Sequence, residues 1–136
     1  MSTLIKSPTE PNNDMRVLVV DDHVSFLKAL SSMLEQQPGF EVIGQAHGGQ
    51  EGLKLAAETQ PDLVVVDFAM PDMNGIEVIR QLKAATKPPK IVMMSFHNEP
   101  EYREMALHAG ADAFLTKTDL HRELVPLLQR LGHSAG

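Results

Sequence analysis

The sequence Val17-Leu18-Val19-Val20-Asp21-Asp22 joins a short apolar run to two carboxylates. Four more apolar runs rich in branched residues follow it, at Glu41–Ile43, Leu63–Val66, Ile91–Met94 and Ala113–Leu115. Continuous apolar runs, in contrast to alternating ones, are typical of strands that are covered on both faces, as in a parallel sheet. The sequence therefore predicts five buried strands.

Between these runs, apolar residues recur at helical spacing. Four helices are marked in this way, by Val24, Leu27, Leu30 and Leu34; by Leu53, Ala56 and Ala57; by Ile76, Ile79 and Leu82; and by Leu120, Leu124, Leu127, Leu128 and Leu131. A further helix is predicted to start near Asn98, which can cap it together with Glu101, with Pro100 in the first turn. Pro126 lies inside the last helix and is expected to kink it or shift its start.

Five strands that alternate with five helices predict an α/β fold, in which a doubly wound parallel sheet carries helices on both faces. The 136 residues suit a single domain, predicted at 15–131. Residues 1–14 are polar and rich in proline and asparagine, and are predicted to be a disordered leader. Residues 132–136 are expected to form a flexible tail.

Composition narrows the function classes. The absence of cysteine excludes a disulfide scaffold and any thiolate metal site. The net charge of −6 and the lack of a basic run argue against a nucleic-acid surface. No apolar stretch approaches the roughly 20 residues of a membrane span, and no signal-peptide layout is present. We therefore expect a cytoplasmic protein that makes no direct contact with nucleic acid or membrane.

Polar residues end four of the five predicted strands. Asp21 and Asp22 follow the first strand, Asp67 the third, Ser95 the fourth, and Lys117 the fifth. In doubly wound folds, ligands bind beyond the carboxyl ends of the strands. The same edge is therefore the predicted site.

Three carboxylates brought together repel one another, and a hard cation relieves the repulsion. Mg²⁺ prefers oxygen ligands and binds through one or two carboxylates plus phosphate oxygens. A carboxylate beside it can attack phosphorus and form an aspartyl phosphate. Lys117 could then neutralise one phosphoryl oxygen and the Ser95 hydroxyl could donate a hydrogen bond to another.

Each of these residues also has an ordinary explanation when it is taken alone. Asp22 could cap the following helix, and Asp67 could be a turn residue before Pro71. Ser95 and Lys117 could be solvated loop residues. Their joint placement at one edge of the sheet favours the phosphoryl site.

The motifs resemble those of one family. These are Val17–Asp22; Asp67-Phe68-Ala69-Met70-Pro71-Asp72-Met73-Asn74-Gly75; Ser95; and Gly110–Lys117. In this order and spacing they resemble the receiver domains of two-component response regulators, over about residues 16–131. The resemblance implies a flavodoxin-like sheet of order 2-1-3-4-5 and a stand-alone architecture like that of chemotaxis regulators.

The resemblance also implies roles for single residues. Asp67 matches the phosphoacceptor, Asp22 the direct Mg²⁺ ligand, and Asp21 its neighbour that acts through water. The carbonyl of Ala69 would complete the metal ligands, and Ser95 and Lys117 would hold the phosphoryl group. Phe114 matches the aromatic switch residue that turns inward with Ser95.

Partners and lifetime follow from the same resemblance. The phosphoryl donor would be a phosphohistidine on a sensor histidine kinase or a histidine phosphotransfer protein. The output would be contact with a downstream protein or a phosphorylation-dependent homodimer. Ala69 cannot orient an attacking water and His97 could shield the phosphate, so we hypothesise slow autodephosphorylation. The bulky Phe96 after Ser95 could narrow access for small phosphodonors.

Other functions fit the sequence less well. A phosphatase with an aspartyl nucleophile, of the haloacid dehalogenase type, would want an acid where Ala69 stands. A flavin-binding module would have its phosphate repelled by Asp21 and Asp22. Two alternatives stay open: an unphosphorylated docking scaffold, and the receiver fragment of a longer DNA-binding regulator, which the sequence Ser95-Phe96-His97-Asn98 resembles. The expectation is a phosphoacceptor that catalyses its own transfer, and not a separate enzyme.

Overall fold

The computed structural model describes the backbone of residues 14–135 and the side chains of residues 14–131. Its five strands are β1 (Met15–Val20), β2 (Phe40–Ala46), β3 (Leu63–Asp67), β4 (Lys90–Ser95) and β5 (Ala113–Thr116). Its helices are α1 (Val24–Glu35), α2 (Gly49–Thr59), α3 (Gly75–Lys83), α4 (Pro100–Ala109) and α5 (Leu120–Ala135), with a short 3₁₀ turn, η2 (Lys117–Asp119), before α5.

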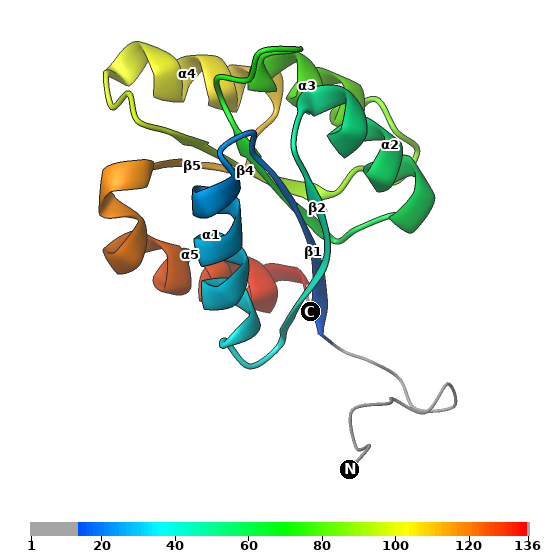
Figure 1. The fold of residues 1–136 in the computed structure, drawn as a ribbon, viewed down its shortest axis with the longest axis vertical. Helices are drawn as coiled ribbons and strands as arrows, with labels where there is room; N and C mark the ends of the chain where they lie inside the picture. Colours follow the sequence, from blue (N-terminus) through cyan, green and yellow to red (C-terminus); the bar gives the residue numbers. More distant parts are fainter. Residues whose placement is uncertain (1–13, 136) are drawn as a thin grey trace.

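The strands form one parallel sheet in the order β2-β1-β3-β4-β5, as predicted. Figure 1 shows α1 and α5 on one face of this sheet and α2, α3 and α4 on the other. The order reverses between β1 and β3, so the crevice between their carboxyl ends is where ligands bind in this fold.

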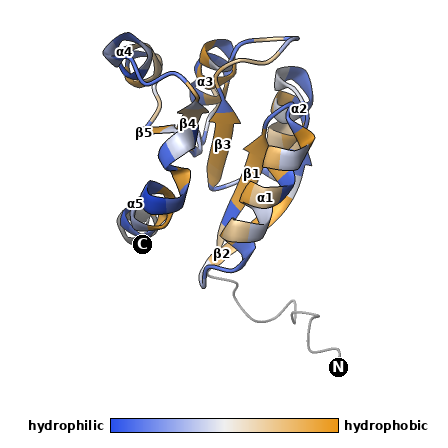
Figure 2. Cartoon of the chain, turned by 60° about the vertical axis from the view of Figure 1, so that its left-hand side comes forward, coloured by the Kyte–Doolittle hydropathy of each residue, from blue (hydrophilic) through white to orange (hydrophobic). Residues whose placement is uncertain are grey.

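Both faces of the sheet are covered, which explains the continuous apolar runs. Successive residues of β1 alternate between two cores: Leu18 and Val20 pack toward α2 and α3, whereas Val17 and Val19 pack toward α1 and α5. All four side chains are fully buried. In Figure 2 the central strands are accordingly hydrophobic along their length, between helices with mixed surfaces.

Two of the residues that marked helices do not face the core. Val24 is 49% exposed at the start of α1, and Ala57 is exposed on α2. The partly buried Leu55 packs against the core instead. The positions of α1 and α2 were predicted correctly. The residues of α2 that face the core include Leu55 and not Ala57.

The predicted cap of α4 is wrong. The helix begins at Pro100, and the residue before it, Glu99, takes the cap position without a side-chain hydrogen bond. A residue before proline is driven into extended backbone, and Glu99 has φ −62° and ψ 142°. The proline therefore sets the start of the helix, and Asn98 lies one residue too early to cap it.

Pro126 does not shift the start of α5, which runs from Leu120 to Ala135 with the proline inside it. Pro126 is exposed, whereas Leu124, Leu127 and Leu128 around it are buried. The hydrogen bond that proline removes is therefore lost on the solvent side, where water can satisfy the carbonyl.

The ends of the chain bear on two further expectations. The expected leader at 1–14 lies outside the described residues except for Asp14, and the backbone of the expected tail is helical as far as Ala135. Among the described residues, none of the helices has the length and apolar character needed to cross a membrane.

Candidate phosphoryl-transfer and metal site

The polar residues predicted from the strand ends do lie along one edge of the sheet. Asp67 and Ser95 are the last residues of β3 and β4, Asp21 directly follows β1, and Lys117 directly follows β5. All four are buried, with at most 5% of each residue exposed. Burying charged groups is costly unless they are paired, so this arrangement points to a site and not to surface loops.

Lys117 is the centre of the charge pairing. Its Nζ lies 2.7 Å from Asp21 Oδ2 and 2.9 Å from Asp67 Oδ1, and none of its side chain is exposed. Two aromatic rings flank the same ammonium: the Phe26 centroid is 4.4 Å from Nζ, and the Phe96 centroid is 5.1 Å from it. Cation–π contacts of this length hold a lysine head group in place and limit its hydration.

The electrostatics single out Asp67. Burial raises the pKa of its carboxyl, and the nearby charges of Asp21 and Asp22 raise it further. The hydrogen bond and charge of Lys117 act in the opposite direction. A carboxylate in this position gains from any further positive charge in the crevice.

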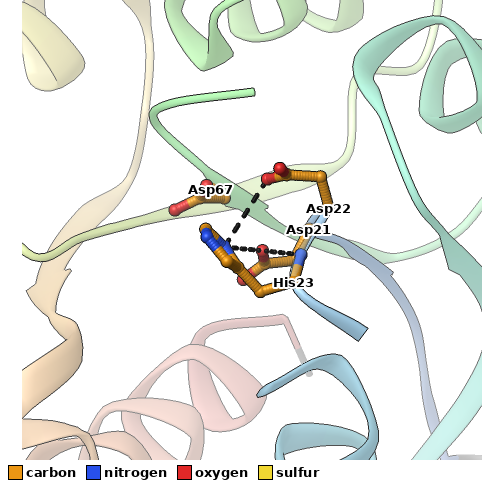
Figure 3. A group of neighbouring side chains, drawn as sticks. All are labelled: Asp21, Asp22, His23 and Asp67. Atoms are coloured by element: carbon orange, nitrogen blue, oxygen red, sulfur yellow. Dashed lines mark hydrogen bonds and ion pairs between the residues drawn. The ribbon is translucent and has the colours of Figure 1, made fainter. Parts of the chain in front are cut away.

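The acidic residues form a cluster that can hold a cation. Asp21, Asp22, His23 and Asp67 each offer a ligand atom, and these atoms lie within 4.8 Å of one another. Figure 3 shows the four side chains gathered close to one another. Asp22 Oδ1 is buried and accepts no hydrogen bond from any residue that the structure describes. A buried carboxylate oxygen without a donor, beside two more carboxylates, fits the all-oxygen ligand preference of Mg²⁺.

Ser95 is turned toward its own loop. Its Oγ accepts a hydrogen bond of 3.0 Å from the backbone N–H of His97. The His97 ring is 54% exposed and stacks on Tyr102 of α4 with centroids 4.6 Å apart, and Tyr102 meets the edge of Phe68. The hydroxyl of Ser95 is therefore linked, through one loop, to the face of α4.

Phe114 and Ala69 lie at different depths. Phe114 is 3% exposed within β5, with the Arg103 guanidinium 5.3 Å from its ring centroid. Ala69 is exposed in the loop after Asp67. The roles predicted for both residues remain proposals.

The loop after Asp67 is fixed by two neighbours. A Cβ on Gly75 would lie 2.5 Å from the Asp67 carbonyl oxygen, so only glycine lets α3 start this close to the strand. Asp72 accepts hydrogen bonds from the backbone N–H groups of Gly49 and Gln50 at 3.0 and 2.9 Å. Because Gly48 at the cap position of α2 has no side chain, Asp72 caps that helix from another loop.

Three residues of the site were missed in the sequence. His23 follows the acidic pair directly, but a single histidine beside two aspartates forms no pattern that marks it as part of the cluster. Phe26 looked like one more apolar residue of α1. Asp72 lies in the motif of residues 67–75, but its role as the cap of α2 was not predicted. A cap that comes from a distant loop leaves no local sequence pattern.

The doubly wound sheet, with a lysine-paired acidic cluster at its switch point, places the protein among the α/β domains that bind ligands at the carboxyl ends of their strands. The model of the response regulator receiver domain family matches residues 17–129. The chain belongs to this family and is a receiver domain of two-component response regulators.

Relatives and solved structures agree. The transcriptional regulatory protein LiaR of Bacillus subtilis is 36% identical over 115 residues, which are 85% of this chain and 54% of that protein. The nitrate/nitrite response regulator protein NarL of Escherichia coli K12 is 32% identical, over 84% of this chain and 53% of that protein. The chain thus spans about half the length of these relatives. The solved receiver domain of the putative response regulator NarL from Mycobacterium tuberculosis has a TM-score of 0.83 and 30% identity, covering 89% of this chain and 98% of that one.

Proposed function

We propose that this receiver domain is a switch that accepts a phosphoryl group on Asp67 with Mg²⁺ and signals through protein contacts. The observation that carries the proposal is the buried contact of Lys117 with Asp67, 2.9 Å long, beside the cluster of Asp21 and Asp22. An ordinary structural ion pair would not need two further carboxylates in the same crevice. The domain is a phosphoacceptor and not a separate enzyme.

In the proposed transfer, an Asp67 carboxylate oxygen attacks the phosphorus of a phosphohistidine. The new O–P bond forms as the P–N bond breaks, and the leaving imidazole nitrogen keeps the electron pair and takes up a proton. Asp22, Asp67 and the Ala69 carbonyl, with Asp21 acting through water, would hold Mg²⁺, which when bound would stabilise negative charge on the phosphoryl oxygens. Lys117 exchanges its contact with Asp67 for a phosphoryl oxygen, while Asp21 holds it in place.

The switch begins at Ser95. In the structure its Oγ accepts a hydrogen bond from the backbone N–H of His97. If the Ser95 hydroxyl donated a hydrogen bond to a phosphoryl group on Asp67, Ser95 would be drawn toward Asp67. The loop that carries His97 and Phe96 would follow, and with it the stacking on Tyr102. Phe114 is already buried, so its proposed rotation requires an outward position in part of the unphosphorylated population.

The phosphoryl lifetime is set by Ala69 and His97 in this proposal. The methyl group of Ala69 cannot orient a water molecule, and the half-exposed His97 ring lies beside the crevice, so hydrolysis is slow. Quantifying the phosphorylated fraction of purified protein over time tests this, and a half-life of seconds would contradict it. Ala69→Asn, which adds a polar group, is expected to shorten the lifetime.

The decisive experiment is intact mass after incubation with Mg²⁺ and either acetyl phosphate or a panel of autophosphorylated histidine kinases. We expect one added phosphoryl group that requires Mg²⁺ and is absent in Asp67→Asn. If neither small donors nor the kinases label the protein, the switch proposal falls and the unphosphorylated docking scaffold takes its place.

The relatives favour a second candidate, in which this receiver controls a DNA-binding domain. LiaR and NarL are named as regulators and are about twice as long as their match to this chain. The partners we propose are a sensor histidine kinase or a histidine phosphotransfer protein, and one downstream protein. The location we propose is the cytoplasm. Light scattering with and without phosphorylation tests the homodimer, and titration with DNA tests the expected lack of direct nucleic-acid binding.

A further inference from the structure

Three aromatic rings connect the two loops that flank the site. His97, two residues after Ser95, stacks on Tyr102 of α4, with centroids 4.6 Å apart and an interplanar angle of 20°. Tyr102 also meets Phe68, the residue after Asp67, edge to face, with centroids 5.1 Å apart and an interplanar angle of 83°. Stacked and edge-to-face pairs at these separations attract one another. One side chain of α4 therefore joins the loop after β3 to the loop after β4.

Tyr102 is the fixed member of this group. It lies in the first turn of α4, which starts at Pro100, and its backbone N–H donates a hydrogen bond of 3.0 Å to the Glu99 carbonyl. The rings of Tyr102 and Phe68 pack against the core between the sheet and the helices α2, α3 and α4. The His97 ring is 54% exposed, and its 3.6 Å contact with the exposed Glu99 carboxylate holds it only weakly in water. The position of His97 therefore depends on the stack.

We propose that these three rings form an aromatic latch, which holds Ser95 in the position that it takes without phosphate. The inference rests on the proposed function and deepens it, because it names what opposes the switch. The backbone N–H of His97 donates a hydrogen bond of 3.0 Å to Ser95 Oγ. Movement of Ser95 toward Asp67 either carries the His97 backbone along or leaves that N–H without this partner. Tyr102 is the positioning residue of the latch, because it contacts both loops.

The latch has a consequence for affinity. A contact made in only one of two states shifts the equilibrium toward that state, and a ligand that needs the other state then binds more weakly. One aromatic pair shifts an equilibrium by about two- to tenfold. Removing the Tyr102 ring should therefore tighten the binding of BeF₃⁻, which with Mg²⁺ mimics a phosphoryl group on Asp67, by about this factor. A residue that only supports the fold would weaken this binding when it is removed.

Amide hydrogen exchange tests the latch without phosphate. Tyr102→Leu keeps an apolar side chain against the core but removes the stack, so the protection of the His97 N–H should fall by about two- to tenfold. His97→Ala keeps this N–H and removes the ring, and it should act in the same direction. Tyr102→Phe keeps an aromatic ring and should leave the protection unchanged. Leu107→Ala, at a 44% exposed position of α4, is the matched control for changes to the helix and should also have no effect.

Titration with BeF₃⁻ and Mg²⁺ tests the coupling of the latch to the switch. Tyr102 is the only tyrosine in a chain without tryptophan, so tyrosine fluorescence reports on the latch alone and should change as the wild type binds BeF₃⁻. Calorimetry, which also serves the variant without tyrosine, should give tighter binding in Tyr102→Leu and His97→Ala. Tyr102→Phe and Leu107→Ala should keep the wild-type affinity.

Two results would overturn the latch. One is unchanged or weaker BeF₃⁻ binding in both Tyr102→Leu and His97→Ala, and the other is unchanged protection of the His97 N–H in these variants. A wild-type chain that binds no BeF₃⁻ would instead count against the proposed function. The exchange experiment would still decide whether the stack holds the loop, so the two failures are distinguishable.

Discussion

Replacing Lys117 with methionine tests whether the buried ion pairs hold the site together. Methionine keeps most of the apolar stem between Phe26 and Phe96 but removes the ammonium from Asp21 and Asp67, at 2.7 and 2.9 Å. Removing one partner of a buried pair typically costs about 3–5 kcal/mol, because it leaves an unpaired buried charge. Against a usual total of about 5–15 kcal/mol, this is a large share of the stability.

The loss should depend on pH in a defined direction. Burial already raises the pKa of Asp67, and Lys117 is the group that opposes the rise. Without it, the native carboxylates hold protons that the unfolded chain has released, so the stability of Lys117→Met falls as pH rises above the ordinary aspartate range of about 4. The deficit relative to the wild type is therefore largest near neutral pH and shrinks toward acid.

Urea unfolding followed by circular dichroism, in a chelator, measures both effects. The double variant Lys117→Met, Asp67→Asn should recover part of the lost unfolding free energy. The amide of asparagine carries no charge that would be left buried and unpaired. If Lys117→Met lowers the free energy of unfolding by less than about 1 kcal/mol at neutral pH, the reasoning is refuted. A loss that small is what a solvent-exposed surface ion pair contributes. A loss that does not change with pH would refute the reasoning as well.

Four further outcomes are expected. Gly75→Ala should cost about 1–3 kcal/mol in urea unfolding, because its Cβ would meet the Asp67 carbonyl oxygen at 2.5 Å. Asp72→Ala should lower the unfolding free energy by about 1 kcal/mol near neutral pH, because it removes the cap of α2. The backbone N–H groups of Gln50 and Gly49 lower the pKa of Asp72, so the stabilisation by this cap should be lost as pH falls through that pKa. Mg²⁺ at about 100 times its Kd should raise the unfolding free energy by about 2.7 kcal/mol in a thermal or urea assay, and Asp22→Asn should abolish the gain. Leu124→Ala, at a fully buried position of α5, should cost about 2–5 kcal/mol in the same unfolding assay.

The strands and their order could be predicted because each apolar run is buried on both faces and each turns polar where it ends. Val17 to Val20 illustrate this, since all four are fully buried although they alternate between two cores. Pro100 lies in the first turn of α4 as predicted, but the cap was placed at Asn98 because a capping pattern there competed with the backbone restriction that proline imposes. The restriction acts on every conformation of the chain, whereas a cap bond is worth only about 1 kcal/mol.

The site was predictable for residues that terminate strands, and not for those brought in from helices and loops. Asp21, Asp67, Ser95 and Lys117 are fixed by parallel strands whose carboxyl ends share an edge. Phe26 of α1 reaches Lys117, which directly follows β5, and a contact between residues so far apart in the chain is encoded by no local pattern. The contact of Ser95 Oγ with His97 N–H likewise depends on a side-chain rotation that the sequence leaves open.

The charge balance of the crevice favours the binding of a cation beside Asp67. Three carboxylates face one ammonium, and burial together with the charges of Asp21 and Asp22 already disfavours ionised Asp67. In the proposed transfer Asp67 attacks as the carboxylate, so added positive charge, which favours the ionised form, would favour the reaction. In the proposed switch, a divalent ion would supply this charge and would also offset that of the phosphoryl oxygens, so metal binding and phosphoryl acceptance would be coupled through the ionisation of Asp67.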